Sequence, residues 1–421
     1  MKEDKTVPQL RFPEFTDAWK QCKLSDLVNV IDGDRGKNYP TEADFEPHGH
    51  TLFLNASNVT IDGFLFDTNQ FITEEKSNSM GSGKIIKDDI IITSRGSLGH
   101  IAWYNDSVQQ VMPHLRINSG MLILRNKANV KTSYLHQFMK SDKGKAQIVF
   151  MSFGSAQPQL TKKGVESFTV NYPIDTEEQI KIGAFFSKLD NTITLQQRKL
   201  NSLQKLKKGL LQKMFPKNGE NIPEIRFPEF SDAWKQRKFG DVLVSIQTGT
   251  NKLGSDRNSG QPLLKMGNLQ SGYFDLSKLE FLENKAEPEN IVKQGDFFFN
   301  TRNTLELVGK GATWFGESNK YAFNSNIARF TLKDINTGFF NYLYNTNYVK
   351  KQIRARAMGT TSVAAIYPRS LKSVDIVIPN MEEQIKLSNL FMNLDSTITL
   401  QQRKLESLQK LKKGLLQQMF I

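Results

Sequence analysis

The stretch TITLQQRKLNSLQKLKKGLLQ occupies Thr192–Gln212, and TITLQQRKLESLQKLKKGLLQ occupies Thr397–Gln417. Twenty of the 21 positions are identical, and the one difference is Asn201 against Glu406. Internal repeats at a long period indicate a chain that is built from a repeated structural unit. The near-identity of these two stretches therefore predicts that the chain contains one unit written twice.

A second repeat supports this interpretation. RFPEFTDAWKQCK at Arg11–Lys23 returns as RFPEFSDAWKQRK at Arg226–Lys238. The regions between the repeats differ more, but DDIIITSRGSLGHIAWY at 88–104 and GDFFFNTRNTLELVGKGATWF at 295–315 occupy matching places. The order is thus a short motif, a variable region and a helix-like segment, followed by the same three parts again. We expect the two variable regions to be diverged copies of one domain.

The repeated helix-like segments have apolar residues every three or four positions, as an amphipathic helix requires. Each helix is predicted to run for about 38 residues, roughly 57 Å at 1.5 Å per residue, with a possible break near Asp190. A lone amphipathic helix of this length cannot bury its own stripe. The two copies are therefore predicted to pair as an antiparallel coiled coil, and separate contacts with other proteins are the alternative. The expected core residues are Ile193, Leu200, Leu203, Leu206, Leu210, Ile398, Leu405, Leu408, Leu411 and Leu415.

The predicted fold class is α+β, with two similar mixed α/β domains separated by the two long helices. The expected boundaries are 1–176, 177–217, 218–381 and 382–421. Strands are expected at 90–93, 101–104, 121–124, 297–300 and 327–332, and helices at 133–150 and 339–358. Since the second copy of the RFPEF motif directly follows the first helix, the first copy is expected to pack near the end of the second helix, around Phe420. The chain would then have pseudo-two-fold symmetry and a circular organisation.

Composition restricts the function. Lys plus Arg exceed Asp plus Glu by 56 − 43 = 13, and the pI is near 9.5, which favours a nucleic acid or another anionic partner. Residues 191–217 include many basic residues and no acidic ones. They could form a solvated helix face, or a surface that attracts phosphates or an acidic partner. Cys22 is the one cysteine, which excludes an internal disulfide. No apolar run of signal-peptide or membrane-span type is present, so a cytoplasmic location is expected.

Catalytic motifs are missing from the sequence. GSGK at 81–84 lacks the first Gly and the final Ser or Thr of a phosphate-binding loop. No His, Cys and Asp cluster has metal-ligand spacing, so no metal site is predicted. The sequence predicts a protein of recognition and assembly rather than an enzyme.

The sequence resembles the specificity subunits of type I restriction-modification systems along nearly its whole length. The resemblance rests on the two variable regions, the two repeated helices, and PIDTEEQ at 173–179 with PNMEEQ at 379–384 before each helix. TSRGSLG at 93–99 also resembles an element of the target-recognition domains of this family, of which NTRNTLE at 300–306 keeps only the Arg.

The resemblance implies that each variable region reads one half of a bipartite double-stranded DNA site and that the paired helices set the gap. It implies two methyltransferase subunits that methylate adenine N6 with S-adenosylmethionine, and restriction subunits that use ATP and Mg. No cofactor and no catalysis are expected in this chain.

Base edges are read by polar side chains that loops present, while phosphate contacts position the protein. Each candidate could instead be an ordinary exposed loop residue. Asn58 and Asn268 could instead form turns beside Gly63 and Gly272. The DNA-binding candidates of the first region are Arg35, Lys37, Asn38, Asn55, Asn58, Arg95, Ser97, Arg116, Ser155 and Gln157. Those of the second are Asn251, Lys252, Lys265, Asn268, Arg302, Asn303, Asn324, Asn326, Arg354, Arg356, Thr360 and Thr361.

Two other functions remain open on the sequence. A coiled-coil adaptor that joins proteins without contacting DNA fits the helices, and it predicts no salt-dependent binding to duplex DNA. A self-sufficient nuclease or methyltransferase is disfavoured by the missing motifs.

Overall fold

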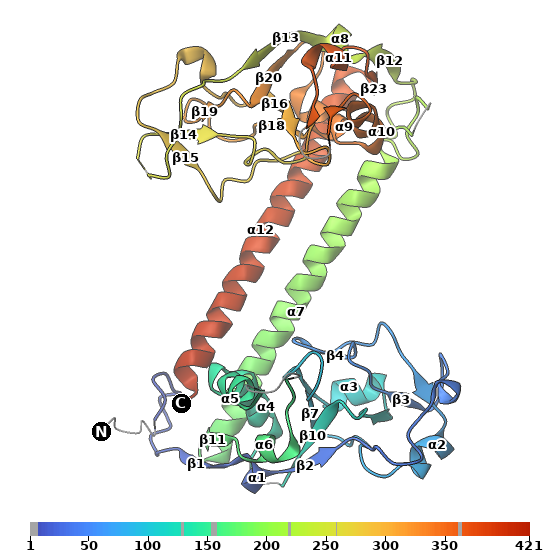
Figure 1. The fold of residues 1–421 in the computed structure, drawn as a ribbon, viewed down its shortest axis with the longest axis vertical. Coiled ribbons are helices and arrows are strands. Elements are labelled where there is room, and N and C mark those ends of the chain that lie inside the picture. Colours follow the sequence, from blue (N-terminus) through green and yellow to red (C-terminus); the bar gives the residue numbers. More distant parts are fainter. Residues whose placement is uncertain (1–6, 128–129, 153–157, 218–219, 258, 361–363) are drawn as a thin grey trace. The chain divides into compact units, whose positions relative to one another are not determined.

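The computed structural model describes residues 7–127, 130–152, 158–217, 220–257, 259–360 and 364–421 (Figure 1). Its contacts divide the chain into two units: unit 1 is Met1–Gln197 with Lys404–Ile421, and unit 2 is Arg198–Arg403. Each unit thus contains one variable region, the beginning of one long helix and the end of the other. None of the helices in the described ranges is long and apolar enough to cross a membrane.

The centre of unit 1 is a four-stranded antiparallel sheet. Its strands, in spatial order, are β2 (Val28–Asp32), β10 (Met121–Asn126), β7 (Ile90–Thr93) and β8 (Ile101–Trp103). Ile90 and Ile92 face one apolar cluster while Ile91 faces another, so the central strand is buried on both sides. This double burial explains why the strand is a continuous apolar run rather than an alternating one.

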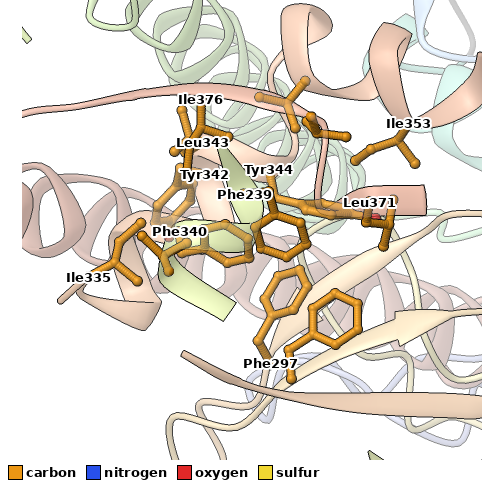
Figure 2. Close-up of a cluster of buried hydrophobic side chains, with 14 of the residues drawn as sticks. Phe239, Phe297, Ile335, Phe340, Tyr342, Leu343, Tyr344, Ile353, Leu371 and Ile376 are labelled. Carbon is orange, nitrogen blue, oxygen red and sulfur yellow. The ribbon is translucent and has the colours of Figure 1, made fainter. Parts of the chain in front are cut away.

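Unit 2 has the same sheet, with strand order β13 (Leu243–Thr248), β20 (Ile327–Leu332), β16 (Phe297–Asn300) and β18 (Gly311–Thr313). Its core is rich in aromatic side chains, which pack with Ile and Leu residues (Figure 2). The ring of Phe297 lies 4.7 Å from that of Phe340 and 4.9 Å from that of Tyr344, measured between centroids. Aromatic pairs at these separations stabilise a core beyond the burial of their area.

A smaller three-stranded sheet also occurs in both units with the same order and directions. It contains β6 (Phe71–Ile72), β3 (Thr51–Phe53) and β9 (Leu115–Arg116) in unit 1, and β15 (Glu280–Leu282), β14 (Gln261–Leu264) and β19 (Ala322–Phe323) in unit 2. In each, the middle strand is antiparallel to the first and parallel to the last. Two shared sheet topologies show that the variable regions are diverged copies of one domain. Unit 1 adds the hairpin of β4 (Val59–Thr60) and β5 (Gly63–Phe64).

The expected helices at 133–150 and 339–358 are each divided in two, so the prediction of single helices was wrong. The segments are α4 (Thr132–Lys140) and α5 (Asp142–Ser152), and α9 (Thr337–Tyr344) and α10 (Asn347–Arg354). Ser141 and Thr346 have extended backbone between the paired segments. Their hydroxyl groups donate to the carbonyl oxygens of Phe138 and Leu343, at 2.6 and 2.8 Å. Local side-chain to backbone bonds of this kind compete with helix continuation.

Short helices complete the two units. In unit 1 these are α1 (Leu24–Leu27), α2 (Glu74–Ser79), α3 (Asp106–Val111) and α6 (Lys162–Glu166), with a 3-10 turn at Glu42–Asp44. In unit 2 they are α8 (Phe239–Val242) and α11 (Pro368–Leu371), with a 3-10 turn at Pro288–Asn290.

The RFPEF motif fastens each variable region to the helix that follows it. Arg11 donates two hydrogen bonds to Glu178, at 2.6 and 2.7 Å, and Trp19 Nε1 donates to the same carboxylate at 3.3 Å. Arg226 and Trp234 repeat this arrangement on Glu383, at 2.8, 2.7 and 3.3 Å. We call each group of three side chains an Arg–Glu–Trp clasp. Beyond the clasps, β1 (Lys20–Lys23) pairs with β11 (Thr169–Tyr172), and β12 (Lys235–Lys238) with β23 (Asp375–Ile378).

The long helices are α7 (Thr176–Lys213) and α12 (Met381–Met419), and α7 continues through Asp190 without a break. In unit 1, Lys412 near the end of α12 forms an ion pair with Asp190 near the beginning of α7. In unit 2, Lys207 of α7 forms the equivalent ion pair with Asp395 of α12. Within each unit, therefore, the end of one helix packs against the beginning of the other, as antiparallel pairing requires.

The end of α12 also closes the first unit. The ring of Phe420 lies 6.5 Å from Trp19 and 5.4 Å from Tyr134, and Leu10 N–H donates to the Gln418 carbonyl at 2.9 Å. Unit 2 has the same contacts along a continuous backbone, since the ring of Phe215 lies 6.0 Å from that of Trp234 and Ile225 N–H donates to the Lys213 carbonyl at 2.9 Å. The prediction that Arg11–Lys23 packs around Phe420 is confirmed.

The coiled-coil residues fall into three groups by exposure. Leu200 and Leu405 are buried, and each is only 2% exposed. Leu206 and Leu411 are 50% and 52% exposed, so their prediction as core residues was wrong. Helical periodicity places residues on a face, but it does not say where that face ends. The other six are partly buried: Ile193, Leu203, Leu210, Ile398, Leu408 and Leu415.

Candidate nucleic-acid interface

One edge of the large sheet in unit 1 gathers loops that are far apart in the sequence. Asp32 at the end of β2 lies opposite Leu122, and Thr93 at the end of β7 lies opposite Met121, so both ends meet the beginning of β10. Because these strands are antiparallel, the loops 33–38, 94–99 and 118–120 emerge side by side. We call these three loops the polar edge of unit 1.

Hydrogen bonds hold the loops of this edge together. Arg35 donates to the Ser119 carbonyl at 3.2 Å, and the neighbouring Gly120 carbonyl accepts from Ser94 N–H at 2.7 Å. Arg95 follows Ser94 and donates to Gln159 Oε1 at 3.1 Å. The guanidinium groups of Arg35 and Arg95, from loops 60 residues apart, are therefore presented at one edge, and both residues are exposed.

The first loop is held in shape by an acidic residue. The Asp34 carboxylate accepts from the backbone N–H groups of Gly36 and Gly81, both at 2.7 Å, and these bonds lower its pKa. The carboxylate thus stays ionised and orders the segment that carries Arg35 and the exposed Lys37. Asn38 Nδ2 donates to the Ser79 carbonyl at 2.7 Å and so ties the loop down further along.

Unit 2 places its candidates at the equivalent edge. Thr248 at the end of β13 lies opposite Ala328, and Asn300 at the end of β16 lies opposite Ile327, so both ends meet the beginning of β20. The loops 249–252, 301–303 and 324–326 form the polar edge of unit 2. They carry the predicted residues Asn251, Lys252, Arg302, Asn303, Asn324 and Asn326. Ser325 N–H donates to the Thr250 carbonyl at 3.0 Å, which joins two of the loops.

Arg302 and Asn303 also form β17, the edge strand of a third small sheet. Its order is β17 (Arg302–Asn303), β22 (Ala364–Ala365) and β21 (Met358–Gly359). Arg302 is exposed, and its side chain makes no hydrogen bond or ion pair with any residue in the described ranges. The guanidinium therefore presents its donors to solvent.

Some predicted residues have internal roles instead. Arg116 is only 2% exposed, and its guanidinium donates to the carbonyl oxygens of Met80, Gly81 and Ser82. The Arg356 guanidinium donates to the carbonyl oxygens of Gln352, Ser370 and Ser373. Arg116 is buried and Arg356 is only partly exposed, and both guanidinium groups are held by partners within the protein, so the structure does not support their prediction as DNA contacts. Burial and backbone partners could not be read from residue type.

Asn58 and Asn268 form turns, which was the alternative reading of these residues. Asn58 is fully buried; its Oδ1 accepts from Asn55 N–H at 2.9 Å and its Nδ2 donates to Leu65 and Thr68. Asn268 makes the corresponding bonds with Lys265, Asp275 and Lys278. Asn324 is likewise 8% exposed and accepts from Asn326 N–H.

The remaining candidates differ in their surroundings. Lys252 and Lys265 form ion pairs with Glu287 and Glu280. Ser97, Asn251, Asn326, Arg354 and Thr360 are exposed, whereas Asn55 and Asn303 are partly buried. Ser155, Gln157 and Thr361 lie outside the described residues.

Gln159, Met358 and Tyr367 lie beside the predicted residues in the structure, although they were not among the candidates from the sequence. Gln159 lies within the Gly-centred stretch SFGSAQPQL, but only the fold brings it to Arg95. Met358 and Tyr367 are 64% and 47% exposed, and an apolar residue type gives no signal of exposure in a sequence. In the part of the chain that the structure describes, no three His, Cys, Asp or Glu residues are grouped as for a metal ion.

Comparison with known proteins identifies the family of this chain. Residues 16–205 and 231–410 each match the type I restriction modification DNA specificity domain. The chain belongs to the family of type I restriction-modification specificity subunits. It is 22% identical to the type I restriction enzyme MjaVIII specificity subunit of Methanocaldococcus jannaschii, over 98% of this chain and 93% of the relative. It is 21% identical to the putative MjaX specificity subunit of the same organism, over 96% and 93%.

The fold of this specificity subunit is also that of a solved relative. The crystal structure of the S subunit from M. genitalium aligns over 99% of both chains with a TM-score of 0.66, at 12% sequence identity. The α+β architecture with two target-recognition domains and two long helices is therefore the fold of the family.

Proposed function

We propose that this specificity subunit reads a bipartite DNA site, with the target-recognition domain of each unit reading one half. The observation that carries the proposal is the polar edge, which the same three strand ends form in unit 1 and in unit 2. Base-edge readout requires donors and acceptors on loops that project from a rigid scaffold. The edges differ in sequence, so they suit different half-sites.

We further propose that the long helices set the gap between the half-sites and bind two methyltransferase subunits. Unit 1 exposes Leu195 of α7 at 62% and Leu411 of α12 at 52%. Unit 2 exposes the equivalent Leu400 at 64% and Leu206 at 50%. Exposed apolar residues that recur at equal exposure on a duplicated scaffold suit two copies of one partner. Binding two copies of the same partner would require the same exposed residues in both helices.

In this proposal the chemistry belongs to the partners. The methyltransferase subunits bind S-adenosylmethionine and methylate adenine N6, and restriction subunits use ATP and Mg to act on unmethylated DNA. The net charge of +13 supports association with duplex DNA, and log affinity is expected to fall linearly with log salt concentration.

The test is reconstitution. The purified chain, its methyltransferase subunits, and the two together are each incubated with a genomic DNA library and S-adenosylmethionine. Only the mixture is expected to methylate adenine, and only within a two-part motif with a fixed gap. Methylation without a motif refutes the proposal, and so does a single continuous site. Salt-independent binding, or no binding to duplex DNA, favours a protein adaptor instead.

A further inference from the structure

The small sheet β17–β22–β21 of unit 2 has one outward face, which its burial pattern identifies. Along the strand from Ala364 to Tyr367, exposure alternates: Ala364 is 0% exposed and Ile366 is 1% exposed, while Tyr367 is 47% exposed. Ile366 N–H donates to the Thr301 carbonyl at 3.0 Å, so the strand pairing continues past Ala365. Since successive side chains of a strand point to opposite faces, Ala365 and Tyr367 lie on the outward face.

Strand register places Arg302 and Met358 on that same face. Arg302 and Met358 are both paired with Ala365, one on each side. Residues directly opposite one another in a sheet point the same way, and neighbouring strands lie about 4.8 Å apart. The backbones of Arg302 and Met358 are therefore about 10 Å apart, with the small Ala365 between them. The guanidinium and the thioether project from the same face of the sheet.

The outward face combines exposed donors with exposed apolar surface. Met358 is 64% exposed, and Arg302 has no side-chain partner among the residues that the structure describes. Tyr367 adds a ring over which the Arg369 guanidinium lies at 5.7 Å. None of the residues of the three strands is acidic. Positive charge without carboxylates suits a polyanion better than a protein surface.

We propose that this face enters the DNA major groove, where Met358 contacts a thymine methyl group and Arg302 donates to a guanine. The major groove is about 12 Å wide, admits a β-ribbon, and displays both the thymine C5-methyl and the guanine O6 and N7 acceptors. A flexible thioether fits an apolar group of this size. The inference rests on the proposed function, because it names the chemistry that the second target-recognition domain reads.

This chemistry belongs to unit 2. The sheet β17–β22–β21 has no counterpart among the described residues of unit 1, although unit 1 has the other two sheet topologies. Methyl sensitivity is therefore expected in the half-site that unit 2 reads.

The test uses the complex of the chain with its methyltransferase subunits and duplexes that carry the mapped site. Each thymine is replaced singly by deoxyuridine, which removes only the methyl group. For the wild type, one replacement, in one half-site, weakens equilibrium binding about fourfold, the effect of one buried methyl group. Met358→Ala binds the unmodified duplex about fourfold more weakly and loses nothing further on that deoxyuridine duplex.

Met381→Ala is the matched control, since Met381 is a 44% exposed methionine of the same unit and lies at the start of α12. It is expected to retain the wild-type sensitivity to deoxyuridine. The inference is overturned if Met358→Ala keeps that sensitivity, if no single replacement weakens the wild type, or if neither half-site contains thymine. Equal binding of the wild type to every duplex, matched or unmatched, would instead show that the proposed function is wrong.

Discussion

Removal of the Glu383 carboxylate tests the Arg–Glu–Trp clasp. The side chain is 1% exposed and accepts two hydrogen bonds from Arg226, which is itself 11% exposed, and one from Trp234. Glu383→Ala leaves the buried guanidinium without its counter-charge. Loss of one partner of a buried pair costs about 3–5 kcal/mol, a large share of the ~5–15 kcal/mol that stabilises a domain.

Urea unfolding measures this cost. With a slope of about 2 kcal/mol per molar, the midpoint of unit 2 is expected to fall by roughly 1.5–2.5 M. Hydrogen exchange of peptides from the start of α12 assigns the transition to that unit. Glu382→Ala is the control, because Glu382 is 72% exposed and its ion pair with Lys386 at 3.7 Å is worth about 0–1 kcal/mol.

A double variant separates charge from packing. Arg226→Met with Glu383→Leu removes both charges while keeping apolar volume, and it is expected to recover most of the lost stability. Glu178→Ala should repeat the loss in unit 1, where the clasp has the same bonds. A midpoint for Glu383→Ala within about 0.3 M of the wild type would refute the assignment of the clasp as the fastening between motif and helix.

Three further predictions concern α4 and the helices. Burial lowers the pKa of His136 to about 3, against about 6.5 in the unfolded chain. Because the unfolded state then binds the proton first, stability is lost as pH falls from about 6.5 toward 3. His136→Asn introduces the residue found at the equivalent position of α9, and it should reduce the change of the urea midpoint between pH 7 and 4.5. An unchanged dependence of the midpoint on pH would contradict this. Leu200→Ala should cost about 2–5 kcal/mol in unfolding experiments, whereas Leu206→Ala should cost under about 1 kcal/mol yet weaken methyltransferase binding; equal stability losses would contradict the burial difference. Seven residues inserted into each long helix at the unit boundary add about 10.5 Å, so methylation mapping should show a gap about three base pairs longer with unchanged half-sites, and altered half-sites would argue against the spacer role.

The sequence predicted those features that repetition and periodicity encode. Two nearly identical helical stretches predicted the duplicated plan, and their apolar spacing predicted helices of about 38 residues, where the structure has helices of 38 and 39 residues. The circular closure around Phe420 followed from the position of the second RFPEF copy alone. These features depend on relations within the chain, so they need no knowledge of the surroundings of a residue.

Other features depend on surroundings. Arg116 and Arg95 are the same residue type, yet Arg116 ends strand β9 and is buried among carbonyl oxygens, whereas Arg95 lies in a loop and is exposed. The polar edge exists because β10 lies between β2 and β7, and strand order is not written in any local pattern. Leu206 has the same helical spacing as Leu200, but it lies outside the packed stripe.

The central claim is that each unit reads its own half of one DNA site. Methylated adenines are mapped in a host that expresses the methyltransferase subunits with the wild-type chain, with Arg95→Ala or with Arg302→Ala. The wild type is expected to give two half-sites with a fixed gap, Arg95→Ala to relax bases in one half only, and Arg302→Ala to relax bases in the other. If both variants change the same half, or if both weaken every sequence evenly, the claim is contradicted.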